Sequence, residues 1–350
     1  MKNSTKLKIA ALQMDANPAP TLERLQRAER LVMGASESGA QLIVLPECFN
    51  TGYAFSEENH TRVEKIDGLT ATWLHDTAVR LNIHLAGSFM LLDEGDTYNT
   101  LLLFAPDGRS WRYDKNYPWG WEQGFFRGSR LKPRITIADT DLGDIGMLIC
   151  WDVSHAELWE MYAGQVDLMI ISSCPVEIGH ATYQFPNGDS FVPDDLGPRF
   201  AANADTVLLA FGDMLNQQAA WLGVPAVHST ECGRIQTPIP RGREAMLGYA
   251  LASPKTLRYL PQANEIQMTS DLVQECKILD SSGEVLTKLS KEDGEAFTLA
   301  SVNLAQSKIS PQNPQPASLI PRTSYFLADV FLPAITKPVY RKGQRLWKNA

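Results

Sequence analysis

Short apolar runs alternate with segments of helical periodicity at the start of the chain. Residues 9–14 and 42–47 are apolar runs of the length of a buried strand, and the second run ends in a carboxylate. Residues 21–38 carry apolar side chains on one helical face, and residues 71–81 and 84–89 predict a further helix and strand. This alternation predicts an α/β fold.

The pattern then changes to one that favours antiparallel strands. Residues 97–104 and 110–114 flank a turn at Pro106–Gly108, which predicts a hairpin. Further along, the sequence predicts helices over 155–163 and 200–222 and strands over 135–139, 144–149, 166–172, 224–228, 275–279, 285–289 and 296–302. Periodicity alone therefore predicts an α/β fold with hairpins, which suits two mixed sheets packed on each other.

Composition and charge exclude several classes of protein. The 350 residues are 44% apolar and 21% charged, as in a globular protein rather than a disordered or fibrous one. No uncharged apolar run reaches the ~18 residues of a membrane-spanning helix. The N-terminus has no signal-peptide pattern, so we expect a cytoplasmic protein. The net charge of −8 argues against a nucleic-acid partner.

Five cysteines are scattered through the sequence. None belongs to a CxxC pair or has a histidine nearby at metal-ligand spacing, so neither a disulfide scaffold nor a zinc site is expected. A buried cysteine is most often a small apolar residue. Each cysteine therefore needs a further reason before it is assigned to catalysis.

A carboxylate follows the second predicted strand, in the segment Leu45–Tyr53. Burial at the end of an apolar strand raises the pKa of a carboxyl group, here that of Glu47, toward the range of a useful general base. Taken alone, Glu47 is more simply explained as the cap of a following helix.

A lysine followed by aromatic residues, proline and glycine begins the segment 115–128. These residue types build a stiff loop walled by rings, and an ammonium group in such a place can stabilise a developing oxyanion. Taken alone, Lys115 is more simply explained as a surface lysine after a hairpin.

Small and apolar residues lead into Cys150, and a predicted helix follows at once. This strand–turn–helix has the form of a nucleophile elbow. We expect the helix dipole to lower the pKa of the thiol from ~8.5, and backbone N–H groups at the helix start can hold an oxyanion. A buried structural cysteine fits the same residues equally well.

Together, and in this order, the segments resemble the nitrilase (carbon–nitrogen hydrolase) superfamily. The matching stretches are Leu45–Glu47, Thr51–Tyr53, Tyr113–Lys115, Ile149–Asp152 with Glu157, and Ile278–Leu286. The resemblance covers about residues 7–305 and implies a four-layer α-β-β-α sandwich of two mixed sheets with outer helices. It also implies one hydrolase domain over residues 1–310.

The resemblance implies a Glu–Lys–Cys triad. Glu47 would be the general base, and Cys150 the nucleophile that forms a thioester. Lys115 and the backbone N–H of Trp151 would stabilise the oxyanion. Glu122 matches a second acidic residue that amidases of the superfamily keep near the thiol. The partner would be a small-molecule amide or nitrile, with no metal or organic cofactor.

Details of the motifs favour amides over nitriles. The Lys115 loop and the residues around Cys150 look most like the aliphatic amidase branch, whereas nitrilases proper usually carry glutamate where this chain has Asp152. Ser154 stands where many superfamily amidases have arginine, which argues against a carboxylate-bearing substrate. The alternatives are a nitrilase with the same triad and a non-catalytic binding protein on the same fold.

Residues 177–268 depart most from the family pattern, especially 185–198 and 238–268, which we expect to form loops that cover the pocket or contact a second subunit. The candidates for lining the pocket are Tyr53, Trp119, Trp121, Trp151 and Cys174.

The end of the chain is basic. From Arg322 onward there are six Lys or Arg residues and one acid, Asp329. Residues 311–321 are rich in proline, so we expect an extended connector to a C-terminal arm over residues 311–350. The resemblance implies that this arm packs on a neighbouring subunit in a homodimer or larger homo-oligomer.

Overall fold

The computed structural model describes residues 6–129, 132–305, 307–308 and 310–348. Twelve strands form two halves that meet at β1 (Lys6–Asp15) and β11 (Ala226–Cys232). The half around β1 contains β16 (Ala296–Asn303), β2 (Leu42–Val44), β3 (His84–Asp93), β4 (Asp96–Phe104) and β5 (Ser110–Asp114). The half around β11 contains β8 (Leu168–Ser173), β7 (Gly143–Ile149), β6 (Ile137–Thr140), β14 (Lys277–Leu279) and β15 (Val285–Lys288).

The two halves are joined at one end only. Strand β2 ends at Val44, and beyond it β1 pairs in parallel with β11, Gln13–Asp15 against Thr230–Cys232. Elsewhere the halves pack face to face. Ile9 and Ala11 belong to the core between the halves, whereas alternate residues of β1 pack with the outer helices.

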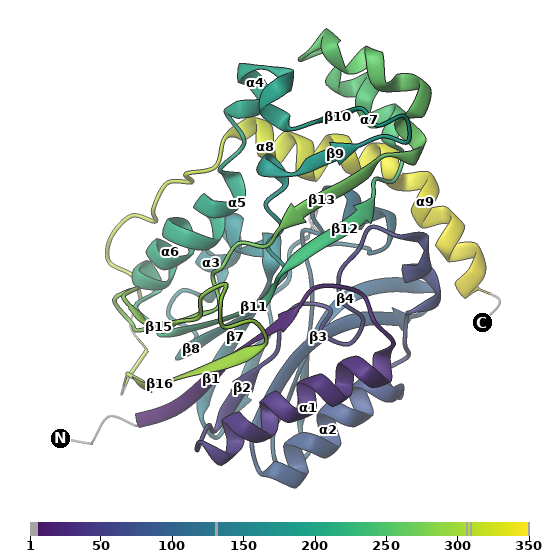
Figure 1. Cartoon of the computed structure of the whole chain (residues 1–350). Helices are drawn as coiled ribbons and strands as arrows, with labels where there is room; N and C mark the ends of the chain where they lie inside the picture. Colours follow the sequence, from purple (N-terminus) through teal and green to yellow (C-terminus); the bar gives the residue numbers. More distant parts are fainter. Residues whose placement is uncertain (1–5, 130–131, 306, 309, 349–350) are drawn as a thin grey trace.

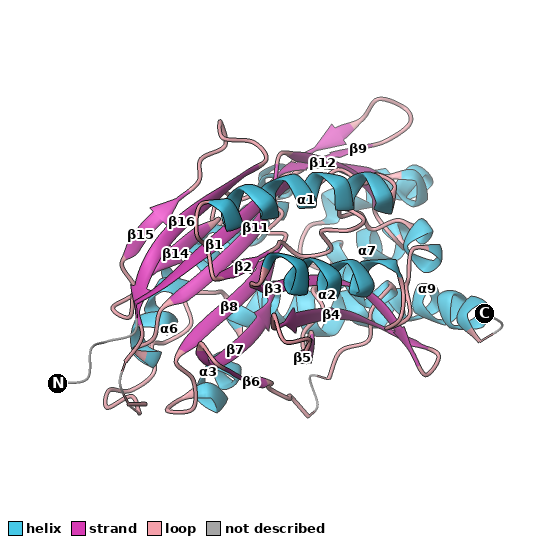
Figure 2. Cartoon of the chain, turned by 90° about the horizontal axis from the view of Figure 1, so that it is seen from below, coloured by secondary structure: helices cyan, strands magenta, loops and turns pink. Residues whose placement is uncertain are grey.

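Helices cover both outer faces of this sandwich (Figure 2). Helices α1 (Thr21–Glu37) and α2 (Leu69–Leu81) pack on the half that contains β1 to β5. Helices α3 (Ala156–Tyr162) and α6 (Leu215–Leu222) pack on the half that contains β7, β8 and β11. The predicted four-layer α-β-β-α sandwich is therefore confirmed.

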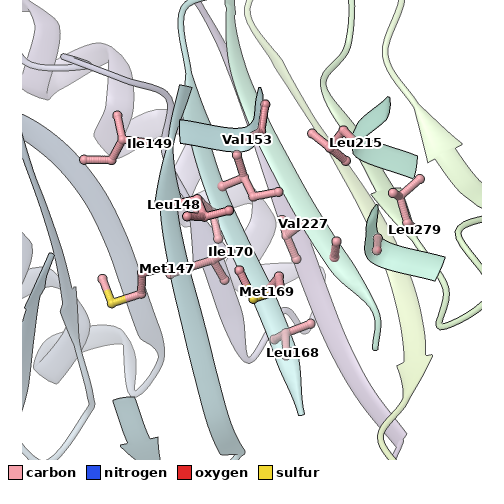
Figure 3. Packing of buried hydrophobic residues seen from close by; sticks show 14 of the residues in the cluster. Met147, Leu148, Ile149, Val153, Leu168, Met169, Ile170, Leu215, Val227 and Leu279 are labelled. Atoms are coloured by element: carbon pink, nitrogen blue, oxygen red, sulfur yellow. The ribbon is translucent and has the colours of Figure 1, made fainter. Parts of the chain in front are cut away.

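The core between the layers is made of continuous apolar runs. Figure 3 shows Met147, Leu148 and Ile149 of β7 beside Ile170 of β8 and Val227 of β11, and all five side chains are fully buried. Strands covered on both faces need no polar alternation. For this reason the buried strands could be predicted from unbroken apolar runs in the sequence.

A smaller sheet lies at the end of the sandwich where β8 and β11 finish (Figure 1). Its four strands are β10 (Ser190–Phe191), β9 (Thr182–Gln184), β13 (Gln267–Asp271) and β12 (Arg234–Pro238). They lie with α4 (Pro198–Ala201), α7 (Gly242–Tyr249) and the 3₁₀ segment η7 (Pro254–Glu265). The region 177–268, expected to form loops, thus contains a folded cap.

The single helix predicted over residues 200–222 is wrong. The structure has α4, then α5 (Thr206–Leu209), a π segment η6 (Ala210–Met214) and α6. Gly212 has ψ −107°, outside the helical range. Glycine adopts such a conformation at low cost, so the periodic apolar pattern continued across a break in the backbone.

The C-terminal arm folds back onto its own chain. Residues 311–321 have no regular structure, and then come α8 (Arg322–Phe326), the π segment η8 (Leu327–Phe331) and α9 (Leu332–Trp347). Trp347 Nε1 donates to the His60 carbonyl at 2.9 Å, and Tyr340 Oη donates to Asp96 at 2.9 Å. Only the connector is extended; contact with a neighbouring subunit stays a prediction.

In the described part of the chain, no helix is long and apolar enough to span a bilayer.

Candidate active site

The three reactive segments converge at one end of the sandwich. Glu47 follows β2, Lys115 follows β5 and Cys150 follows β7. These strands run in the same direction through their pairings with β3, β4, β8 and β11, so their carboxyl ends meet. The side chains are buried, with Glu47 0%, Lys115 1% and Cys150 5% exposed.

One ammonium group links two buried carboxylates. Lys115 Nζ donates to Glu47 Oε1 and to Glu122 Oε2, each at 2.7 Å. Burial by itself lowers the pKa of Lys115, but the charges of Cys150, Glu122 and Glu47 outweigh burial and raise the pKa well above its ordinary value. Lys115 therefore stays protonated at neutral pH. A buried carboxylate without this cation would be strongly destabilising.

Glu47 is held by three donors. Oε1 accepts from Asn99 Nδ2 at 2.6 Å as well as from Lys115, and Oε2 accepts from the Cys174 backbone N–H at 2.8 Å. Burial raises the pKa of Glu47 to about 7, although Lys115 opposes the shift. This direction agrees with the prediction from the sequence. Such a carboxyl group can both accept and return a proton near neutral pH.

Cys150 occupies a sharp turn between β7 and the 3₁₀ segment η3 (Cys150–Ser154). Its φ of +49° lies in the left-handed region, which non-glycine residues adopt at a cost and which is common at functional sites. The strand–turn–helix was therefore predicted correctly. The thiol donates to the Cys174 carbonyl at 4.0 Å, and it lies close enough to Glu47 to lower the pKa of that carboxyl group.

The expectation that the helix start lowers the pKa of the Cys150 thiol is wrong. Burial and the charge of Glu47 raise this pKa well above its ordinary value, and Lys115 offsets only part of the shift. The following 3₁₀ segment has five residues and provides only a small dipole. The resting thiol is neutral, so its activation depends on a base.

Asp152 connects the lysine loop to the cysteine turn. Its Oδ1 accepts from the Tyr117 backbone N–H at 2.8 Å, and its Oδ2 accepts from Tyr113 Oη at 2.7 Å and from the Asn116 backbone N–H at 3.3 Å. Asp152 is fully buried. Because one carboxylate holds both segments, Asp152 fixes the position of Lys115 relative to Cys150.

Glu122 lies in the short 3₁₀ segment η2 (Gly120–Gly124). Its Oε2 accepts from the Trp119 backbone N–H at 2.8 Å, and its Oε1 accepts from Tyr53 Oη. The structure thus places Glu122 beside Lys115 and links it to Tyr53.

A small cavity of about 20 Å³ adjoins the thiol. Four of the five pocket candidates line it, namely Tyr53, Trp119, Trp151 and Cys174. The fifth, Trp121, lines a neighbouring apolar cavity. Among the described residues, no group of three or more His, Cys, Asp or Glu side chains could hold a metal ion.

Sequence reasoning missed several supporting residues. Asn99 is fully buried in the apolar strand β4, and a polar residue in such a run is a signal that could have been used. Asp329 of the C-terminal arm accepts from Trp151 Nε1 at 3.0 Å and is 178 residues away in sequence. Nothing in the local sequence indicates that contact.

Comparison with known proteins gives a family match. The model of the family described as "Carbon-nitrogen hydrolase" matches residues 8–195. Omega-amidase NIT2-A of Xenopus laevis is 32% identical over 173 residues, which cover 46% of this chain and 60% of that protein. A nitrilase of Pyrococcus abyssi is 34% identical over 151 residues, which cover 42% of this chain and 56% of that protein. The chain thus spans less than two thirds of the length of these relatives.

Solved structures share the fold. An amidase from Nesterenkonia sp. superposes with a TM-score of 0.60 at 17% identity, over 87% of this chain and 92% of that one. Nit3 of Saccharomyces cerevisiae superposes with a TM-score of 0.60 at 20% identity, over 85% of this chain and 90% of that one. At these identities the likeness concerns the fold alone.

Proposed function

The chain belongs to the carbon–nitrogen hydrolase family, and from this premise we propose that it hydrolyses a small amide through a thioester on Cys150. One observation carries the proposal. The buried Lys115 ammonium lies 2.7 Å from an oxygen of both Glu47 and Glu122, and Cys150 opens from the same end of the sheet, close enough to Glu47 to affect its pKa. This arrangement supplies a base, a fixed positive charge and a nucleophile in one place.

In the first half of the reaction, the Cys150 sulfur attacks the carbonyl carbon while its proton moves to Glu47. The negative oxygen of the tetrahedral intermediate is stabilised by the Lys115 ammonium and the Trp151 backbone N–H. The intermediate collapses with cleavage of the C–N bond, and the nitrogen leaves with the proton from Glu47. A thioester and ammonia or an amine result.

In the second half, water gives a proton to Glu47 and attacks the thioester carbon. The same donors stabilise the second oxyanion, the C–S bond breaks, and the sulfur regains its proton. Glu47 with a pKa of about 7 suits both directions of proton transfer. Lys115 keeps its proton throughout, and Glu122 keeps Lys115 in position.

Conversion of a nitrile to acid and ammonia is the second candidate. It would use the same thiol through a thioimidate, and a relative named nitrilase supports it. Relatives named omega-amidase and deaminated glutathione amidase support the amide. A non-catalytic role is disfavoured because three buried charged groups are costly to assemble without a function that uses them.

The test is ammonia release from propionamide and propionitrile, which share one acyl skeleton. The proposal expects release from the amide, and in the presence of hydroxylamine it expects propionohydroxamate, because hydroxylamine competes with water for a thioester. Release from the nitrile alone would favour the second candidate. Ammonia from the amide with no hydroxamate at any hydroxylamine concentration would contradict the thioester.

A further inference from the structure

An apolar cavity of about 100 Å³ adjoins the small catalytic cavity. Trp119, Ile178 and Val207 line both cavities and form the wall that they share. We propose that this larger cavity, called here the apolar chamber, binds an apolar acyl group, so that the preferred substrates are primary amides of arylalkanoic or branched alkanoic acids. The inference rests on the proposed function and names its substrate class.

The lining of the apolar chamber is aromatic and carries no charge. Its rings belong to Trp119, Trp121, Tyr183, Phe191, Phe200 and Tyr249. Among the residues described around it, no side chain is acidic or basic. A second charged group on the substrate would lose its water there without gaining a partner, whereas an apolar group gains from leaving water.

The position of the base decides which part of the amide faces the apolar chamber. Cys150 and Glu122 line the catalytic cavity, but Glu47 does not and is 0% exposed. The leaving nitrogen takes its proton from Glu47, so it faces the buried side of a cavity of only about 20 Å³, which leaves little space for a substituent. The leaving group is therefore ammonia, and the acyl substituent faces the open side toward Trp119 and Val207.

An unpartnered donor provides an independent sign of a ligand. Trp121 is 1% exposed, and its Nε1 has no hydrogen-bond partner among the described residues. A buried N–H without a partner is costly, and proteins rarely keep one. Trp121 lines the apolar chamber, and the face of an aryl group bound there can accept this N–H.

The apolar chamber is built by the lysine loop together with the cap and the C-terminal arm. Tyr183 and Phe191 belong to the small sheet, Tyr249 to α7, and Leu327 to the C-terminal arm. Figure 1 shows these elements together above the end of the sandwich. The apolar chamber is therefore closed by the cap and the C-terminal arm, whereas the reactive groups sit on the sandwich.

The first test compares 3-phenylpropionamide with propionamide. We expect kcat/KM to be at least about tenfold higher for the phenyl amide. Leu327→Trp should remove most of this preference, because Leu327 lines the apolar chamber and is only half-buried, so a larger ring can enter the space. Leu251→Trp, at a residue 88% exposed in the same cap, is the matched control and should leave the ratio unchanged.

The second test separates this inference from the proposed function. Cys150→Ala should bind 3-phenylpropionamide at least about tenfold more tightly than propionamide in a calorimetric titration. Equal kcat/KM and equal affinity for the two amides would contradict acyl binding in the apolar chamber and leave the proposed hydrolase activity unaffected. If no amide is hydrolysed but the phenyl amide binds tightly and Leu327→Trp abolishes this binding, the proposed hydrolase activity is contradicted. Ligand binding in the apolar chamber is then supported. If Leu327→Trp does not fold, Leu327→Ala should shift preference toward a naphthyl acyl group, and an unchanged preference would overturn the inference.

Discussion

At the scale of single residues, the site depends on one cation among buried acids. Lys115 donates to Glu47 and Glu122, and all three side chains are at most 1% exposed. The same contacts that position the ammonium for an oxyanion also keep two carboxylates stable in the interior. Catalysis and stability are therefore expected to change together when this residue is replaced.

Lys115→Met tests this dependence. We expect kcat/KM to fall by about 10²- to 10³-fold, as when an oxyanion donor is lost, and the free energy of unfolding to fall by about 3–5 kcal/mol at neutral pH. Ammonia release and urea unfolding measure the two effects. Lys277→Met is the control, since Lys277 is also buried and paired with Glu275 but lies outside the site. An equal loss of activity in both variants would contradict a specific role for Lys115.

The pH dependence of the reaction follows from Glu47. The base acts in its ionised form and its pKa is about 7, so kcat/KM should rise with pH and level off above about 7. The charge of Glu122 raises this pKa. Glu122→Gln should therefore move the rising limb to lower pH as well as slowing the reaction.

A second carboxylate variant serves as the comparison. Glu157 is half-exposed and accepts a hydrogen bond from Tyr117, and Glu157→Gln should leave the limb in place. A pH–rate profile that does not move in Glu122→Gln would contradict the assignment. The contribution of Glu47 to the free energy of unfolding depends on pH in the opposite direction from the rate. Folding raises the pKa of this carboxyl group. Its contribution to stability is therefore complete below the unfolded pKa of about 4.3 and is lost as the pH rises through 7.

At the scale of elements, the C-terminal arm supports the loop that carries Glu122. Gly120 has φ +41°, and a Cβ there would lie 2.7 Å from Leu332 Cδ1, so η2 and α9 are in close contact. Leu332 is 1% exposed. The arm thus packs against the segment that holds Lys115 in place.

Leu332→Ala should lower the free energy of unfolding by about 2–5 kcal/mol because it leaves a cavity against η2. Leu346→Ala lies on the same helix at 51% exposure and should change stability by at most about 0.5 kcal/mol. Urea denaturation of the two variants measures the difference. Equal midpoints would show that the arm does not support the loop.

The elements also show what the sequence could predict. Strands with apolar runs were located closely, as with residues 144–149 and β7. The strands of the cap have only two to five residues, too few for a periodic pattern to stand out, so they were missed. The segments of the triad were predicted because each reactive residue lies at or just after the end of a predicted strand. Asn99 and Asp329 act through contacts between distant segments, which no local pattern encodes.

At the scale of the whole molecule, we predict a homo-oligomer, as the resemblance to the family implies. Phe326 and Val330 lie one helical turn apart on the C-terminal arm and are 56% and 51% exposed. Large apolar side chains exposed next to each other are typical of contact surfaces. We predict that this part of the arm contributes to the subunit contact.

Val330→Glu should convert the predicted dimer to a monomer, because it introduces a charge into an apolar contact. Light scattering coupled to size-exclusion chromatography measures the mass. Leu22→Glu, at a residue 64% exposed on α1, is the matched control and should leave the mass unchanged. A wild-type protein that is monomeric at micromolar concentration would contradict the prediction.

The central claim is that Cys150 is the nucleophile. Its most direct test is ammonia release from a primary amide by Cys150→Ala beside Cys276→Ala, which removes a buried thiol outside the site. The account predicts a loss of at least about 10⁴-fold for Cys150→Ala and nearly full activity for Cys276→Ala. Ammonia release by Cys150→Ala at the wild-type rate would contradict the account.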